Sequence, residues 1–299
     1  MKKFFLNSLL TFSRFFLTRR WLPRGLKKVI WNMDLRYLVW REENFLVKTR
    51  FGFQIYADLR QFIENRIAFF GIWEQGTTEL FLKSIRPGEI VIDMGANIGY
   101  YTLLASRLVG PTGKVYAVEP ARLTRERLLR NLELNHITNV VVLPYGAWDE
   151  EGETYLNFHT EERGRSSVIA NETQEKIVQE KILLKPLWDL IPSEEYSRIR
   201  LVKMDVEGAE QRALKGLLPI FEANQPMTLF SEVIPDSLKA LGGDADEYIQ
   251  FLKSLRFDIS VIDSTESYCV DSYINPHPVT LTPLVGSVQG SIDVFCKRS

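Results

Sequence analysis

The residues with the clearest chemical potential follow a short apolar run at positions 90–92. Asp93 ends this run, and the frame Asp-x-Gly-x-Asn-x-Gly then leads into a helix-like stretch. A short apolar run is typical of a buried parallel strand. Glycine after such a strand allows a sharp turn and close approach of a ligand to the backbone, and the first N–H groups of the next helix can bind an anion. We therefore predict a nucleotide-type cofactor site with contacts from Asp93, Gly95, Ala96, Asn97 and Gly99.

The spacing of this loop separates two classes of cofactor. Dinucleotide sites use Gly-x-Gly-x-x-Gly, and the register of the third glycine is missing here. The carboxylate of Asp93 would repel a pyrophosphate, whereas it suits a cofactor with an ammonium group and no phosphate. We therefore predict S-adenosylmethionine as the cofactor. A nicotinamide-dependent oxidoreductase on a similar sheet is the alternative.

A second apolar strand, expected at 114–119, supports the same site. It ends in Glu119, and Pro120 closes it because proline cannot donate to a sheet ladder. In doubly wound sheets, the acid at the end of the second strand accepts hydrogen bonds from ribose hydroxyls. We predict that Glu119 and Pro120 contact the cofactor.

Together these motifs resemble the FkbM family of class I S-adenosylmethionine-dependent methyltransferases. The residues that carry the resemblance are Asp93–Gly99, Val118–Pro120 and the octapeptide Lys-Met-Asp-Val-Glu-Gly-Ala-Glu at 203–210, the most specific of the three. The resemblance runs from about Phe45 to the C-terminus. It implies a methyltransferase, generally acting on hydroxyl groups, often on sugars or natural products.

Two further segments match this family. Glu74, in Gly-Ile-Trp-Glu at 71–74, is expected to approach the amino end of the cofactor or the acceptor. The pair Ser166 and Ser167 is expected to close over the cofactor, the alternative being an ordinary loop. Gly146 and Ala147 follow the third strand. Residues at that position usually flank the adenine of the cofactor, so we expect both to contact it. Trp148 beside them is predicted either to stack on adenine or to belong to the core.

A hydroxyl acceptor is a weak nucleophile and needs a base to accept its proton. Asp205, at the end of the fourth strand, is the first candidate, and Glu207, Glu232 and His159 are the others. Asp205 is also predicted to contact the cofactor. Glu207 and Glu210 lie three residues apart and are expected to share a helix face. They could instead be acids at a helix N-terminus, favoured by the helix dipole. Coordination of Mg²⁺ by the same acids is a further alternative, although we predict no metal.

The elements that must position these residues alternate between strand and helix, which predicts an α/β fold of the Rossmann-like type. We expect a mostly parallel, doubly wound sheet with an antiparallel last strand and an N-terminal helical extension. Residues 1–44 are predicted to form the extension and 45–299 the FkbM-like domain. Within it, 45–88 is an N-terminal addition, expected as a hairpin over 45–58 and a helical region over 59–83 with a break near 71–76. Residues 89–299 form the core, with an inserted loop at 153–182, expected as a hairpin plus a mobile loop. The strands are expected at 89–93, 114–119, 140–144, 200–205, 227–233, 258–262 and 291–296, and the helices at 98–109, 123–135, 209–221 and 245–255.

Charge is unevenly distributed along the 299 residues. Residues 1–41 hold ten Lys or Arg and one acid, a balance of +9, so the other 27 bases and 37 acids give −10. Phe5, Leu9, Phe12 and Phe16 share one helical face, which predicts either a helix on an anionic membrane surface or one packed on protein. No uncharged run approaches the length of a membrane span. The acidic body argues against nucleic acid.

Two cysteines exclude a disulfide framework, so we expect a cytoplasmic protein, with peripheral contact to the inner membrane surface through residues 1–41. The predicted partner is a hydroxyl-bearing small molecule or glycan. A cofactor-binding module without catalysis, associated with the membrane, is the remaining alternative.

Overall fold

The computed structural model describes residues 44–159, 166–167, 177–263, 273 and 278–298, together with Phe12, Phe15 and Pro23. The chain divides into two compact units, one comprising Met1–Leu80 with Ser264–Val279 and the other Phe81–Asp263 with Thr280–Ser299. The predicted N-terminal extension falls almost wholly outside the described residues, so its boundary at residue 44 stays a prediction.

The first unit contains the hairpin predicted near residue 50. Strand β1 (Phe45–Lys48) pairs antiparallel with β2 (Gln54–Ala57), and α4 (Phe62–Phe70) follows. Gly71, in the left-handed conformation, ends α4, and its N–H donates to Ile67 O at 2.7 Å. Helix α5 (Gln75–Ser84) crosses from the first unit into the second. The predicted helical region with a break after residue 70 is therefore confirmed.

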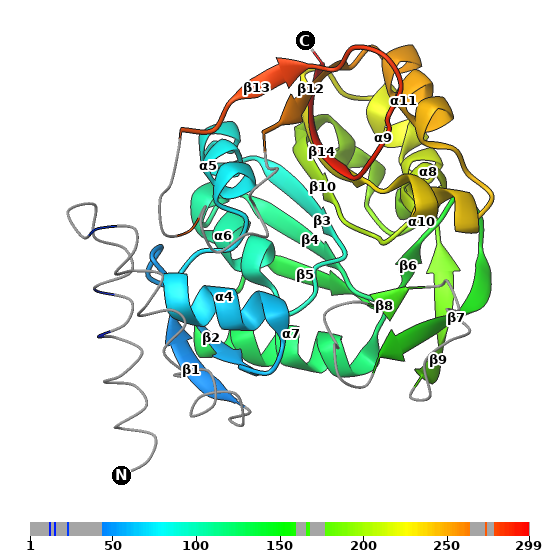
Figure 1. The fold of residues 1–299 in the computed structure, drawn as a ribbon. Coiled ribbons are helices and arrows are strands. Elements are labelled where there is room, and N and C mark those ends of the chain that lie inside the picture. Colours follow the sequence, from blue (N-terminus) through cyan, green and yellow to red (C-terminus); the bar gives the residue numbers. More distant parts are fainter. Residues whose placement is uncertain are drawn as a thin grey trace. The chain divides into compact units, whose positions relative to one another are not determined.

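The second unit is built on one large sheet. Its strands lie in the order β13 (Leu281–Pro283), β12 (Asp258–Ile262), β14 (Ile292–Arg298), β11 (Met227–Val233), β10 (Ile199–Met204), β3 (Ile90–Met94), β4 (Lys114–Val118) and β5 (Val140–Leu143). Strands β11, β10, β3, β4 and β5 run parallel, while β14 is antiparallel to both neighbours. The predicted mostly parallel sheet with an antiparallel last strand is confirmed (Figure 1). The strand order reverses between β3 and β10.

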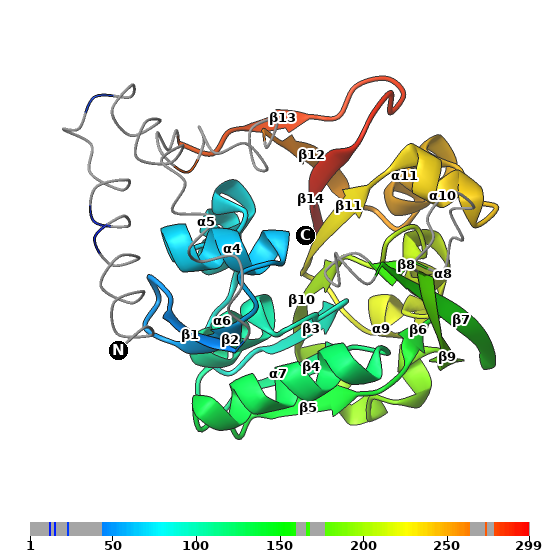
Figure 2. The ribbon, with the colours of Figure 1, turned by 60° about the horizontal axis from the view of Figure 1, so that its bottom comes forward.

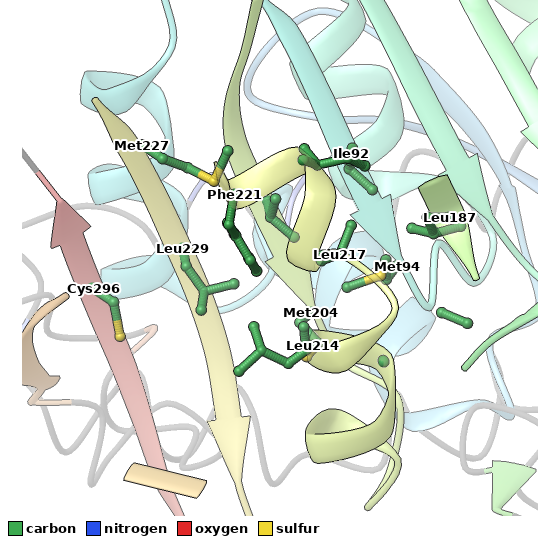
Figure 3. Packing of buried hydrophobic residues seen from close by; sticks show 14 of the residues in the cluster. Ile92, Met94, Leu187, Met204, Leu214, Leu217, Phe221, Met227, Leu229 and Cys296 are labelled. Atoms are coloured by element: carbon green, nitrogen blue, oxygen red, sulfur yellow. The ribbon is translucent and has the colours of Figure 1, made fainter. Parts of the chain in front are cut away.

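Helices cover both faces of this sheet. On one face, α8 (Glu210–Lys215), α9 (Leu218–Glu222) and α11 (Ala245–Ser254) contribute to a large buried cluster. Figure 3 shows part of that cluster, in which Leu214 and Phe221 lie against sheet residues such as Ile92, Met204 and Leu229. On the other side lie α6 (Tyr100–Val109) and α7 (Arg122–Leu134), the latter running alongside β4 and β5 (Figure 2). Because side chains alternate across a strand, Asp93 and Lys203 point to the α6 side.

The prediction of one helix over 209–221 is wrong in one respect, because the structure has two short helices there, α8 and α9. A Cβ on Gly216 would lie 2.0 Å from the carbonyl oxygen of Trp148, so the chain there is pressed against a distant segment. Pro219 in the first turn of α9 lacks an N–H and favours a new helix start. Helix α10 (Pro235–Ala240) was not predicted.

The insertion after β5 forms a separate small sheet, in the order β6 (Gly146–Ala147), β9 (Ile177–Lys185), β7 (Gly152–His159) and β8 (Ser166–Ser167). Strands β7 and β9 pair antiparallel from Gly152 with Leu184 to His159 with Ile177, which confirms the predicted hairpin. The predicted mobile loop falls at 160–165 and 168–176, outside the described residues.

Candidate functional site

The loop after β3 is held in a left-handed conformation at three positions. The φ angles are +76° at Gly95, +51° at Asn97 and +94° at Gly99. The N–H groups of Gly95 and Ala96 both donate to Val118 O at 3.0 Å, so β4 anchors the loop. Asn131, fully buried on α7, donates through Nδ2 to Ile98 O at 2.9 Å. The loop is therefore tied to its neighbours at several points.

Both glycines of the loop are required by packing within the protein. A Cβ on Gly95 would lie 1.8 Å from the carbonyl oxygen of Asp205, and one on Gly99 would lie 2.5 Å from Leu128 Cδ1. The space that each missing side chain leaves is therefore taken by the protein. Any contact of these glycines with a ligand must come through their backbone atoms.

Asp93 is buried at the end of β3, with 1% of its surface exposed. Thr102, in the first turn of α6, donates through Oγ1 to Asp93 Oδ2 at 2.6 Å. Burial raises the pKa of Asp93, against the opposing effect of the nearby Lys203 ammonium. The Asp205 carboxylate raises this pKa as well, so these two acids lie close enough to interact.

Glu119 joins the loop to the end of β4. Its Oε2 accepts the N–H of Asn97 and its Oε1 the N–H of Ala121, each at 2.9 Å. Burial raises the pKa of Glu119 to about 7, although both N–H donors oppose the shift. Each carboxylate oxygen has a second lone pair, so Glu119 can still accept a hydroxyl. Pro120 lies next to it, and its carbonyl oxygen accepts from Arg125 Nη1 at 2.6 Å.

Asp205 follows β10 directly, beside the point where the strand order reverses. Its N–H donates to Met94 O at 3.0 Å. Its Oδ2 lies 3.1 Å from Lys203 Nζ, and its side chain is 33% exposed. Of the candidate acids considered so far, Asp205 is therefore the one that is both fixed by a partner and open to solvent.

The turn from Asp205 to Glu210 is tightly built. Glu207 has a φ of +52° and Gly208 a φ of +100°, and a Cβ on Gly208 would lie 2.6 Å from Ser237 O. Helix α8 begins only at Glu210, so the expectation that Glu207 and Glu210 share a helix face is wrong.

Glu210 itself is 3% exposed and accepts the Gly208 N–H through Oε1 at 3.1 Å. Burial raises its pKa to about 7. Glu210 is therefore a buried acid that holds the turn and begins α8, which agrees with the predicted alternative of an acid at a helix N-terminus.

The other predicted residues lie in several parts of the chain. Glu232 is on β11, one residue beyond the pair formed by Met204 and Ser231, so the register brings it beside Asp205. Gly146 and Ala147 lie in β6 and pair with Leu184 and Lys185 of β9, in the small sheet. Ser167 pairs with Asn157. The side chains of Ser167 and His159 are outside the description.

Glu74 belongs to the first unit. Its N–H donates to the hydroxyl of Tyr273 at 3.1 Å, and its φ is +41°. Its predicted role at the cofactor stays a prediction. Trp148 packs against the cluster of Ala121, Leu156, Ile182 and Leu184, and the Arg212 guanidinium lies 5.6 Å from its ring centroid. These contacts favour the core interpretation of Trp148.

Sequence analysis did not single out Thr102 or Lys203. Lys203 is a charged residue that directly follows the apolar pair Leu201 and Val202 in β10, which is a usable signal because buried charges need partners. Thr102 carries no comparable signal, since a threonine in the first turn of a helix is common.

The arrangement presents the buried acids Asp93 and Glu119 and the partly exposed Asp205 at three strand ends around one glycine-containing loop, with the buried Lys203 among them. Such an edge suits a ligand with hydroxyl donors and positive charge. Among the described residues there is no group of three or more His, Cys, Asp or Glu side chains placed to hold a metal ion. None of the helices in this part of the chain is both long and apolar enough to cross a membrane.

Comparison with known proteins gives several methyltransferases among the relatives. The chain is 31% identical over 144 residues to Methyltransferase 1 of Beauveria bassiana, covering 42% of this chain and 57% of that protein. It is 30% identical over 146 residues to the hexuronic acid methyltransferase AglP of Haloferax volcanii, covering 48% and 56%. The chain thus spans somewhat over half the length of these curated relatives. A SAM dependent methyltransferase from Aquifex aeolicus matches with a TM-score of 0.40 and 14% identity, covering 79% of this chain and 93% of that one.

The family comparison covers most of the candidate site. The model of the methyltransferase FkbM domain matches residues 93–259, from the first acid of the loop to the strand β12. That range is more than half of the chain and includes Glu119 and the 203–210 octapeptide. The chain belongs to the FkbM methyltransferase domain family.

Proposed function

We propose that this protein is an S-adenosylmethionine-dependent methyltransferase that methylates a hydroxyl group on a sugar, glycan or natural-product acceptor. The observation that carries the proposal is the link between Glu119 and Asn97, which places a buried acid of the second strand against the loop of the first. Ligands in open α/β sheets bind at the carboxyl ends of the strands where the order reverses. Asp93 and Asp205 flank that reversal here.

The residues present fit this cofactor. Glu119 would accept the ribose hydroxyls, and Asp93 would hold the loop in shape through Thr102 while adding negative charge. A sulfonium and an ammonium are both cationic, which suits an edge where acids outnumber bases. When bound, the cofactor supplies an already activated methyl group, so the protein mainly has to align donor and acceptor.

Asp205 is the proposed base. Its carboxylate is open to solvent on one side and fixed by Lys203 on the other, so it can receive a proton from an acceptor hydroxyl. Glu232 and Glu207 are the alternative bases. The sugar-type acceptor is supported by the printed function of one relative, the hexuronic acid methyltransferase from Haloferax volcanii.

The proposal is tested by direct binding. Isothermal calorimetry should show S-adenosylhomocysteine bound by the wild-type protein, with no measurable binding in Asp93→Ala and weakened binding in Glu119→Ala. Lys181→Met, which breaks a surface pair with Glu153, serves as the control and should bind as the wild type does. A folded wild-type protein that binds NADH and not S-adenosylhomocysteine would point to the oxidoreductase instead.

Binding should also depend on pH through Glu119. Ribose hydroxyls donate to the ionised carboxylate, and the pKa of Glu119 is about 7 in the free protein. If only the ionised form binds, the affinity falls in proportion to its population. The dissociation constant should then be about tenfold higher at pH 6 than at pH 8. Calorimetry in Glu119→Gln should show a much smaller difference between these pH values, and an unchanged difference would reject this role for Glu119.

Mass spectrometry can identify the acceptor. Incubation with S-adenosylmethionine and a panel of hexuronic acids, other sugars and lipid-linked glycans should yield a product heavier by one methyl group. Cofactor binding without any methylated product across this panel would favour the non-catalytic module. Peripheral contact with a membrane through residues 1–41 stays a prediction, since those residues lie almost wholly outside the description.

A further inference from the structure

Lys203 is a buried cation at the centre of the candidate site. It lies in β10 with 5% of its surface exposed, and register pairs it with Asp93 on β3. Its Nζ is 3.1 Å from Asp205 Oδ2 and 4.6 Å from the ring centroid of Tyr101 on α6. The ammonium therefore has three neighbours: the Asp205 carboxylate at the end of the same strand, Asp93 on the adjacent strand, and the ring face of Tyr101.

These neighbours keep the lysine charged despite its burial. Burial alone disfavours an ammonium, whereas the two acids and the ring face each favour it. The attraction is mutual, because the Lys203 charge opposes the upward shift of the Asp93 pKa. Asp93 already accepts a hydrogen bond from Thr102. Lys203 therefore contacts Asp205 directly and influences Asp93 through its charge.

We propose that Lys203 is a positioning residue whose ammonium fixes Asp205 and holds the place at which a divalent cation would otherwise bridge Asp93 and Asp205. This inference rests on the proposed methyltransferase function for its catalytic consequence. Mg²⁺ and Mn²⁺ favour carboxylate oxygens, and a dication held by Asp205 would be repelled by the ammonium at hydrogen-bond distance from Oδ2.

The consequence concerns how the acceptor is activated. The hydroxyl proton passes to Asp205, the oxygen lone pair forms the bond to the methyl carbon, and the electrons of the broken carbon–sulfur bond stay on sulfur. Lys203 holds the receiving carboxylate in place before that transfer. No metal is needed to lower the pKa of the acceptor hydroxyl.

The first test uses the cofactor-free protein and Mn²⁺ alone. Titration followed by electron paramagnetic resonance should show at least tenfold tighter Mn²⁺ binding in Lys203→Met than in the wild type. Lys203→Arg keeps the charge and should behave as the wild type. The double variant Lys203→Met/Asp205→Asn should lose the gained binding, and Lys181→Met should show no gain.

If Lys203→Met fails to fold, Mn²⁺ titration of the wild-type protein still tests the proposal. Stoichiometric Mn²⁺ binding by the wild type that disappears in Asp205→Asn would overturn it, and so would a folded Lys203→Met protein with no gain in Mn²⁺ affinity. Failure of the wild type to bind S-adenosylhomocysteine would instead reject the proposed function, whatever the metal titration shows.

The second test separates positioning from simple structural support. Lys203→Met should lower kcat at least tenfold with little change in the acceptor KM. Lys203→Arg should restore most of kcat. A loss confined to thermal stability, with kcat unchanged, would overturn the positioning role.

Discussion

Replacing Gly95 with alanine should abolish cofactor binding and destabilise the protein by about 2–5 kcal/mol. The new Cβ would lie 1.8 Å from the carbonyl oxygen of Asp205, and the φ of +76° is one that alanine rarely adopts. The obstacle is backbone and not the end of a flexible side chain, so either β3 or β10 must shift at its carboxyl end. Both the loop and the proposed base would then move.

Gly242 provides the matched control for this experiment. Its φ is +77°, yet a Cβ there would meet no atom within 4 Å. Gly242→Ala therefore carries the backbone strain alone, about 1 kcal/mol, and should bind S-adenosylhomocysteine as the wild type does. Thermal unfolding and calorimetry measure both effects. Equal stability of Gly95→Ala and Gly242→Ala would contradict the argument that the close approach of the two turns matters.

Asp205→Asn should lower the rate of methyl transfer by about 10²–10⁴-fold, the range typical of a lost general base. The amide has nearly the same shape but cannot receive the proton. Because the amide keeps an oxygen acceptor at the same position, affinity for S-adenosylhomocysteine should stay within about threefold of wild type. Initial rates with the acceptor identified by mass spectrometry, together with calorimetry, measure the two quantities separately.

The other candidate bases supply the comparison. Glu207→Gln and Glu232→Gln leave Asp205 and its lysine in place, so each should retain most of the rate. A near-complete loss in either variant, combined with an active Asp205→Asn protein, would transfer the role of base to that glutamate.

The sequence predicted the central elements closely where local signals and burial agree. The strands at 227–233 and 258–262 have the predicted bounds, because each is a short run rich in apolar residues between turn signals. The division of 209–221 was not predictable locally. It depends on the approach of Gly216 to Trp148, a contact across distant parts of the chain.

The candidate site shows the same limit. Asp93, Glu119 and Asp205 could be named because each ends a strand and the fold gathers strand ends. The partnership of Lys203 with Asp93 needs the register of β10 against β3, which no local pattern contains. Likewise, Gly95 carries a turn signal, but its closest neighbour belongs to a turn more than a hundred positions away in sequence.

The link from the Glu119 carboxylate to the Asn97 and Ala121 N–H groups has an entropic consequence. The loop takes its shape when the protein folds and not when a ligand arrives, so its backbone freedom is already lost in the empty protein. Ligand binding therefore does not require the loop to become ordered, and the affinity is not reduced by that loss of entropy. The Glu119 carboxylate therefore helps to preorganise the loop in the folded protein, in addition to its proposed role in binding the ligand.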